Sequence, residues 1–388
     1  MKEVRLGIVG VGGMGSHHAR CVQGGNVPRL RLTAVCDVDP KALAKFADPV
    51  RRYADSRELI RSGEVDAVLV ATPHYDHTTV GIDALGRGLH LLVEKPISVH
   101  KADAERLIAA WKGNGQVFAA MFNQRTDPYY QRVRRLVQGG ELGALQRVSW
   151  IVTNWFRTQC YYDSGGWRAT WKGEGGGVLL NQCPHNLDLL QWIAGMPVRV
   201  RAFCGLGKRH AIEVEDEVTA YFEYANGATG VFITGTGEAP GCNRLEICGD
   251  RGALVLEEGS LRFTRNETPA AEFLRTSKQG FARPPVWQVA FPPEKDSGTQ
   301  HTGILLNFTE AILDGAPLLA PASDGLRSVE FANAMLLSSM TGQTVELPMD
   351  GAAYERQLQK LVAESRFAKA AATGASADLS GTFNTSKA

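Results

Sequence analysis

The chain has 388 residues, enough for two domains of ordinary size. Hydrophobic residues make up 44% of it and charged residues 21%, which is typical of a globular protein with a large buried core. A net charge of +1 provides no electrostatic basis for binding nucleic acid or an anionic membrane, and no apolar stretch is long enough to cross a bilayer.

The N-terminus lacks the long apolar core and the small-residue cleavage site of a secretory signal. The seven cysteines are scattered and include no Cys-x-x-Cys pair, so we expect neither a disulfide framework nor a metal site. Cys36, Cys204 and Cys248 fall in predicted strands, where a thiol usually acts as a small buried hydrophobe. These features are typical of a protein of the reducing cytoplasm.

The first predicted strand, residues 4–9, runs directly into a turn with the pattern Gly-x-Gly-x-x-Gly. In such a turn Gly10 permits the sharp change of direction, Gly12 lets the backbone approach a pyrophosphate, and Gly15 lets helix and strand pack closely. The helix that follows offers unpaired N–H groups to phosphates. The alternative is an ordinary turn between a strand and a helix. The backbone expected to contact a dinucleotide is that of Gly10, Gly12, Gly13, Met14 and Gly15.

Asp37 ends the second apolar run, about 20 residues beyond the last glycine, where a carboxylate that binds ribose hydroxyls belongs. This carboxylate would repel a 2′-phosphate, and no arginine or serine follows directly to bind one. The sequence therefore favours NAD over NADP as the cofactor.

Strand-like and helix-like segments alternate through the first third of the chain, which predicts a doubly wound parallel sheet. Helical periodicity marks residues 76–87 and 101–111. Ligands bind such sheets at the carboxyl ends of the strands, so the residues just after each strand are candidates for the site. The predicted strands are residues 4–9, 32–36, 67–71, 89–93 and 117–122.

Two later strand ends carry polar residues. After Thr72, Pro73 cannot continue a strand, so the chain turns there. His77 either lies beside the nicotinamide or is a polar residue in the first turn of a helix. At Glu94-Lys95-Pro96 the lysine points towards the crevice, where burial and nearby charge could suit it for proton transfer. The alternative is a surface lysine before a turn.

These motifs in this order resemble the glucose–fructose oxidoreductase / inositol dehydrogenase superfamily, Gfo/Idh/MocA, over roughly residues 4–347. The resemblance rests on the glycine turn, Asp37, Thr72-Pro73 with His77, Glu94-Lys95-Pro96, and residues 175–189. It implies a Rossmann domain followed by an α/β domain with an open, mostly antiparallel sheet. It also implies NAD(P)-dependent oxidation or reduction of sugars and inositols, and a homodimer or homotetramer assembled through that sheet.

Beyond residue 123 the pattern changes to a helix at 128–138 and then a series of strands. Asn226-Gly227 between two of these strands is a strong hairpin signal, so we expect antiparallel pairing. The predicted strands are residues 146–153, 198–204, 218–224, 228–234, 245–248 and 253–256.

A helix is predicted at residues 178–194, with Asn181, His185 and Asp188 on one face. In the pattern of the family, an aspartate stands at position 181 and acts with the lysine and the histidine around the reacting hydroxyl. The resemblance therefore implies that Lys95 and His185 are catalytic. Asn181 cannot ionise, but it can hold a substrate hydroxyl or orient His185.

The loop at residues 153–172 combines aromatic and charged side chains, which suits a sugar with apolar C–H faces and polar rims. Its arginines also permit an acidic sugar. The alternative is a loop pinned over the core by its aromatic rings. The residues expected to bind substrate are Lys95, Trp155, Arg157, Tyr162, Trp167, Arg168, Asn181 and His185.

Residues 265–298 are predicted to form a long irregular loop that reaches a neighbouring subunit. Helices are expected at residues 304–313, 324–340 and 354–370, with His301 near the site and a short strand at 345–347. The expected organisation is a dinucleotide-binding domain at residues 1–123, a substrate-binding and oligomerisation domain at 124–370, and a disordered tail at 371–388.

Three functions fit these features. The leading hypothesis is an NAD-dependent dehydrogenase that transfers a hydride between the cofactor and a secondary alcohol of a sugar or inositol. The second is an oxidoreductive glycosidase, in which oxidation, elimination and re-reduction leave NAD unchanged. The third is a non-catalytic Rossmann protein that senses NAD or a ligand.

Overall fold

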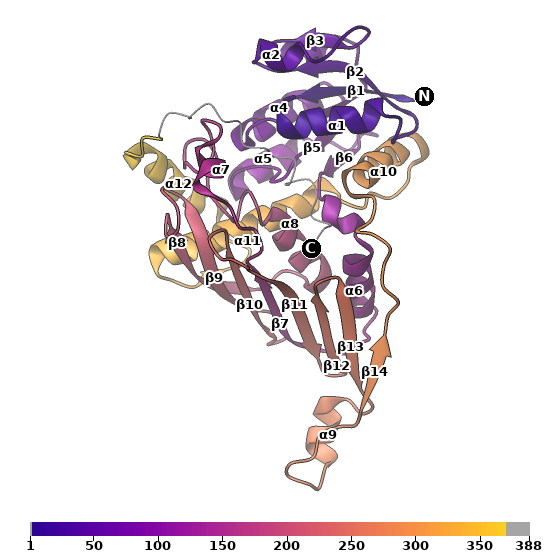
Figure 1. The fold of residues 1–388 in the computed structure, drawn as a ribbon, viewed down its shortest axis with the longest axis vertical. Helices are drawn as coiled ribbons and strands as arrows, with labels where there is room; N and C mark the ends of the chain where they lie inside the picture. The colour runs from indigo at the N-terminus through magenta and orange to yellow at the C-terminus, as the bar shows by residue number, and fades with distance from the viewer. Residues whose placement is uncertain (1, 370–388) are drawn as a thin grey trace.

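In the computed structural model, which describes residues 2–369, the chain forms two sheets (Figure 1). The first has six parallel strands in the order β3-β2-β1-β4-β5-β6. Among its central strands, β4 is buried along its whole length and β1 at every position except Arg5, as expected for continuous apolar runs in a covered parallel sheet. The predicted doubly wound Rossmann sheet is confirmed. Its elements are β1 (Val4–Val9), α1 (Gly13–Gln23), β2 (Leu30–Cys36), α2 (Pro40–Leu43), β3 (Arg51–Tyr53), α3 (Ser56–Arg61), β4 (Ala67–Val70), α4 (His74–Gly86), β5 (His90–Val93), α5 (Lys101–Ala110) and β6 (Phe118–Ala120).

The second sheet has nine strands in the order β14-β13-β12-β11-β7-β10-β9-β8-β15. All neighbouring pairs are antiparallel except β7 (Leu145–Val152) and β10 (Thr229–Gly235). Burial alternates along β12, because one face packs under helices and the other is open. The mostly antiparallel second sheet was thus predicted correctly. Its other strands are β8 (Arg199–Leu206), β9 (Glu215–Glu223), β11 (Asn243–Gly249), β12 (Gly252–Glu257), β13 (Ser260–Asn266), β14 (Val286–Ala290) and β15 (Val345–Glu346).

Helices fill the space between the two sheets, with α8 and α11 crossing the middle of the molecule (Figure 1). The helical elements of the second half are η1 (Asn123–Thr126), α6 (Pro128–Gln138), α7 (Gln159–Asp163), α8 (Pro184–Ala194), α9 (Ala270–Thr276), α10 (Gln300–Asp314), α11 (Ala322–Thr341) and α12 (Gly351–Glu364).

The late part of the chain returns to the first sheet. Ile304, Leu305 and Phe308 of α10 are buried in the same apolar core as β1, β2 and β4. The first core therefore draws on residues far beyond position 123. The boundary between residues 123 and 124 stays a prediction.

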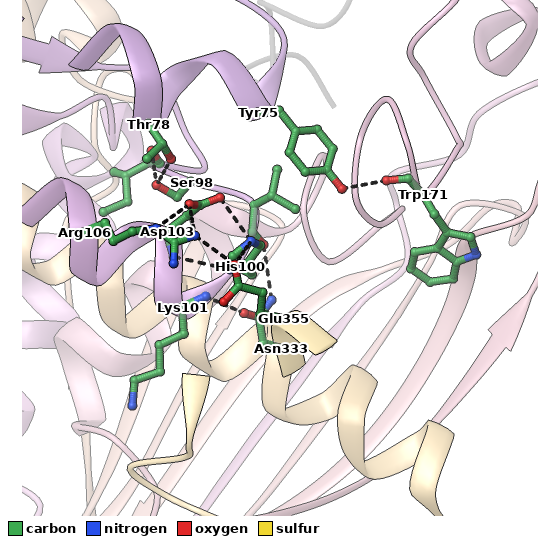
Figure 2. Close-up of polar contacts among 12 residues, drawn as sticks. Tyr75, Thr78, Ser98, His100, Lys101, Asp103, Arg106, Trp171, Asn333 and Glu355 are labelled. Carbon is green, nitrogen blue, oxygen red and sulfur yellow. Dashed lines mark hydrogen bonds and ion pairs between the residues drawn. The ribbon is translucent and has the colours of Figure 1, made fainter. Parts of the chain in front are cut away.

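Polar contacts at the start of α5 join the two halves (Figure 2). The buried Lys101 ammonium donates to Glu330 of α11 at 2.8 Å, and the Lys101 backbone N–H donates to Asn333 at 2.8 Å. Nearer the crevice, the Tyr75 hydroxyl donates to the Trp171 carbonyl at 2.7 Å. The loop that carries the aromatic residues is thus held against α4.

A second buried ion pair anchors α8. Arg125, which is 0% exposed, donates to both carboxylate oxygens of Asp188 at 2.8 and 2.6 Å and to Asp324 of α11 at 2.9 Å. Asp188 lies one turn beyond His185. The guanidinium therefore sets the position of the helix that carries this histidine.

The predicted helix at 178–194 begins too early. In the structure α8 begins at Pro184, because the segment before it is a turn that binds a buried carboxylate. Glu215 accepts backbone hydrogen bonds from Gly177 at 2.9 Å and Leu179 at 3.0 Å. Asn181 consequently lies in this turn and does not share a helix face with His185.

The remaining differences lie at element ends and in exposed segments. Residues 265–298, predicted to be irregular, contain α9, which projects beyond the second sheet, and β14, which pairs with β13 at the edge of that sheet (Figure 1). The last helix, expected at 354–370, is α12 and ends at Glu364. The short elements α2, β3 and α3 were not predicted. The predicted disordered tail lies outside the described residues.

Within residues 2–369, no helix combines the length and apolarity that a membrane span requires. The same residues contain no group of three or more histidine, cysteine or acidic side chains arranged to hold a metal ion.

We expect Arg125→Ala to destabilise the protein by about 3–5 kcal/mol, because Asp188 would remain charged and unpaired in the interior. Urea unfolding followed by circular dichroism measures this loss. Arg31→Ala is the matched control, since it removes an exposed pair with Glu3 and should cost under about 1 kcal/mol. Equal effects of the two substitutions would contradict the structural role assigned to Arg125.

Candidate active site

A cavity of about 1260 Å³ lies at the carboxyl ends of β1, β2, β4 and β5 and is lined by both halves of the molecule. It brings together all but two of the residues that the sequence analysis selected. The exceptions are Gly15 and Tyr162. The selected residues on its walls are Gly10, Gly12, Gly13, Met14, Asp37, Thr72, Pro73, His77, Glu94, Lys95, Trp155, Arg157, Trp167, Arg168, Asn181 and His185.

The glycine turn leaves one side of the cavity free of side chains. Gly10 has φ +86°, which favours glycine. A Cβ on Gly15 would lie 1.8 Å from the Gly10 carbonyl oxygen, so this glycine serves the packing of α1 on β1. A Cβ on Gly12 would meet nothing within 4 Å, so the backbone there is open to a ligand. The turn thus fits a pyrophosphate at the N-terminus of α1.

Asp37 lies at the end of β2 with both carboxylate oxygens engaged. Oδ2 accepts from the Val11 backbone N–H at 2.8 Å and Oδ1 from the Asp39 N–H at 2.9 Å. These bonds orient the carboxylate on the cavity wall while leaving lone pairs for ribose hydroxyls.

His77 joins two loops of the cavity. It lies buried in the first turn of α4, with Nδ1 2.7 Å from the Pro96 carbonyl and Nε2 2.9 Å from the Thr72 carbonyl. It thereby ties the loop after β4 to the loop after β5, where Lys95 lies.

Glu94 is held by a histidine that the sequence analysis did not select. Its Oε1 lies 2.6 Å from Nε2 of the fully buried His18, on α1. Burial raises the pKa of Glu94, but the hydrogen bond and charge of His18 outweigh it, and the pKa falls to about 2. The His301 ring lies 5.5 Å from that of His18 and lines the cavity, as predicted for a residue near the site, and burial lowers its pKa to about 3.

The Lys95 ammonium faces the cavity and donates to the backbone carbonyl of Asn181 at 2.9 Å. Burial lowers the pKa of Lys95, and the positive charges of Arg168 and Arg157 lower it further, whereas the negative charges of Glu94 and Glu174 raise it. The ammonium in these surroundings is a stronger acid than that of a lysine in water.

His185 lies at the start of α8, on the same cavity wall. Burial and the charge of Lys95 hold its pKa well below the ordinary value, so the ring is neutral. Among the described residues, its buried Nδ1 has no hydrogen-bond partner. The ring itself lines the cavity, where it can contact a bound substrate.

Two neighbours orient the side chain of Asn181, which lines the cavity. Its side-chain amide donates to Glu174, and its Oδ1 accepts from the Tyr161 hydroxyl at 3.4 Å. Glu174 was not predicted from the sequence, because a carboxylate that precedes three glycines gives no periodic or motif signal.

Arg157 and Arg168 flank the ring of Tyr161, with their guanidinium carbons 5.2 and 4.8 Å from its centroid. Tyr161 lines the cavity in place of the predicted Tyr162, which is 2% exposed and hydrogen-bonds to Thr236 at 2.7 Å. Tyr162 is therefore a core residue. Both tyrosines belong to the short helix α7, and only the tertiary packing decides which of them faces inward.

Models of known families match both halves of the chain. Residues 4–122 match the oxidoreductase family with an NAD-binding Rossmann fold, and residues 130–255 match the GFO/IDH/MocA C-terminal domain. Together the two matches cover more than half of the chain.

Similar proteins match along most of their length. Inositol 2-dehydrogenase of Rhizobium meliloti is 26% identical over 345 residues, which are 86% of this chain and 96% of that protein. The WlbA dehydrogenase of Chromobacterium violaceum, solved in complex with NADH and UDP-GlcNAcA, is 26% identical with a TM-score of 0.78 and covers 90% of this chain and 97% of its own. Levoglucosan dehydrogenase in complex with NADH shares the fold at 20% identity, with a TM-score of 0.75, covering 90% of this chain and 100% of its own.

We expect Gly12→Ala to fold normally, since the added methyl meets no protein atom, but to weaken NADH binding by about tenfold or more, which is about 1.4 kcal/mol. Titration of NADH fluorescence measures the affinity. Gly86→Ala, at the end of α4 and off the cavity, adds a methyl in equally open space and should leave the affinity unchanged. NADH affinity like that of the wild type in Gly12→Ala would contradict the placement of the pyrophosphate.

Proposed function

Since the chain belongs to the Gfo/Idh/MocA family of NAD-binding oxidoreductases, we propose that it is a dehydrogenase for a secondary alcohol of a sugar-like substrate. One observation carries the proposal. Lys95 and His185 come from different halves of the chain, line one cavity with the glycine turn, and are close enough for the charge of Lys95 to lower the pKa of His185.

The residues of the chain supply proton transfer and orientation. NAD, when bound along the glycine turn and Asp37, supplies the hydride acceptor. Oxidation of an alcohol also releases the hydroxyl proton. The lowered pKa of Lys95 favours a neutral amine that can accept this proton, and the neutral His185 ring can hydrogen-bond to the hydroxyl. In the reverse direction the Lys95 ammonium donates the proton, and both side chains polarise the carbonyl. Asn181 positions the substrate hydroxyl.

Relatives and the cavity wall both support a sugar-like substrate. Inositol 2-dehydrogenase is named for a cyclic polyol, and the WlbA structure contains UDP-GlcNAcA. Trp155 and Trp167 offer flat apolar surfaces to the C–H faces of such a molecule.

The arginine pair supports a substrate with an acidic group. Among the described residues, neither Arg157 nor Arg168 forms an ion pair within 4.0 Å. Burial raises the pKa of Glu174 and the charge of Arg168 lowers it, but both oxygens of this carboxylate are already occupied by Ala169 and Asn181. The buried Nε of Arg157 also lacks a hydrogen-bond partner among these residues. A carboxylate on the substrate would satisfy both guanidinium groups.

The proposal also covers the cofactor, the oligomeric state and the location of the protein. The Asp37 carboxylate supports NAD over NADP as the cofactor. Phe203, which is 63% exposed on β8, together with Leu206 and Tyr221, supports assembly of a homodimer or homotetramer through the open sheet face. The seven unpaired thiols support a cytoplasmic location.

The proposal is tested by incubating the purified protein with NAD and a panel of inositols, sugars and their uronic acids. We expect NADH to accumulate in proportion to ketone product, and Lys95→Met to lower kcat/KM about 100-fold or more. Lys112→Met, an exposed lysine of the same half, is the matched control. A product formed without net NADH would favour the oxidoreductive glycosidase, and turnover within a few-fold of wild type in Lys95→Met would exclude Lys95 from proton transfer.

The acidic substrate is tested with matched pairs such as glucose and glucuronate. We expect Arg157→Gln to lower the ratio of kcat/KM for the acid to kcat/KM for the neutral sugar by about tenfold or more. The ratio cancels any change in the pKa of Lys95 that both substrates share. Arg275→Gln, on the exposed helix α9, should leave the ratio unchanged. A ratio unaffected by Arg157→Gln would contradict an anionic group at this position.

A further inference from the structure

Glu174 is a buried carboxylate directly behind the cavity wall. It is 1% exposed and directly precedes the three glycines at residues 175–177, in the segment that leads into α8. Its Oε2 accepts from the Ala169 backbone N–H at 2.6 Å, and its Oε1 accepts from the side-chain amide of Asn181. Glu174 does not line the cavity. Burial raises its pKa, whereas the charge of Arg168 and these two hydrogen bonds lower it.

The first consequence concerns the orientation of the Asn181 amide. A carboxylate only accepts hydrogen bonds, so the NH₂ group must face Glu174. On the other side, the Tyr161 hydroxyl already accepts from Arg168 at 2.9 Å and from Gln182 at 3.1 Å, which leaves its own proton for Oδ1 of Asn181. The amide is thus oriented from both sides.

Glu174 also contributes to the charge around Lys95. The backbone carbonyl of Asn181 holds the ammonium, and the Glu174 charge raises the pKa of Lys95 against the effect of burial. The Glu94 charge also raises the pKa of Lys95, but the Glu94 carboxylate is hydrogen-bonded to His18. The other charged or titratable groups around the ammonium are Arg157, Arg168, His74, Cys183, His185 and His301.

We propose that Glu174 is a positioning residue of the active site, which orients the Asn181 amide and supplies to Lys95 the negative charge that an aspartate at position 181 would provide directly. This inference rests on the proposed function for Lys95 and Asn181. The carboxylate thus lies behind residue 181 and not at that position. The site keeps a negative charge, while the side chain that faces the substrate is a neutral amide.

Three variants test the proposal: Glu174→Gln, Asn181→Asp and the double variant. In Glu174→Gln, the new amide can accept from Ala169 only by turning its NH₂ group towards the NH₂ group of Asn181, so the Asn181 amide must reorient. In Asn181→Asp, two buried carboxylates face each other. In the double variant, the new amide at position 174 donates to the new carboxylate at position 181, and both the hydrogen bond and the single negative charge return.

We expect each single variant to lower kcat/KM for the best substrate of the panel about 30-fold or more, and the double variant to recover to within about fivefold of wild type. Circular dichroism and NADH affinity, which should stay at wild-type values, report on folding. If the fold loss in kcat/KM of the double variant equals the product of the two single losses, the proposal is overturned.

A second measurement does not need a substrate. The rate at which acetic anhydride acetylates Lys95 in the NAD-saturated protein, followed by peptide mass spectrometry, gives the pH at which the amine loses its proton. We expect this midpoint to fall by about one pH unit in Glu174→Gln, because the pKa-raising charge is gone, and to return towards the wild-type value in the double variant.

The two measurements separate the proposals. A midpoint that shifts as expected in a protein that oxidises nothing in the panel would leave the role of Glu174 standing and remove the proposed dehydrogenase activity. An active dehydrogenase whose Lys95 midpoint and pH–rate profile do not move in Glu174→Gln would overturn the role of Glu174 alone.

Discussion

The buried hydrogen bond between His18 and Glu94 connects the helix after the glycine turn to the strand end that carries Lys95. It joins α1, whose N-terminus follows the glycine turn, to the carboxyl end of β5 at a distance of 2.6 Å. The other oxygen of Glu94 accepts from the Lys95 backbone N–H at 3.1 Å. One buried carboxylate thus sets the position of Lys95 relative to the helix at which a pyrophosphate would bind, and neither end could move without leaving a buried polar group unpaired.

The second half of the molecule is held in place by the same kind of interaction. Glu215 binds the backbone of the turn before α8, and Arg125 binds Asp188 within α8. These contacts hold Asn181 and His185 in the lining of the cavity that the glycine turn also lines. Burial raises the pKa of Glu215 to about 7, although backbone N–H groups oppose this effect. The carboxylate that holds the turn therefore loses solvation free energy on burial.

Positive charge gathers around Lys95 in the cavity. Arg157 and Arg168 lie near Lys95, and the nearest negative charges, Glu94 and Glu174, are both occupied by other partners. Burial is the main reason that the pKa values of Lys95 and His185 are lowered, and neighbouring positive charge lowers both further. In the proposed function, the same positive charge would suit an anionic substrate.

The sequence alone determined the parallel sheet, the glycine turn, Asp37 and the lysine after β5, because local patterns carry these features: continuous apolar runs, a glycine spacing, and residues placed directly after a strand. It could not locate the start of α8, because the turn before it depends on Glu215, a residue from a distant strand. Tertiary packing also decided that Tyr161 faces the cavity and that Glu174 lies behind Asn181. Contacts between residues distant in the chain leave no periodic signal, so only the folded structure could place them.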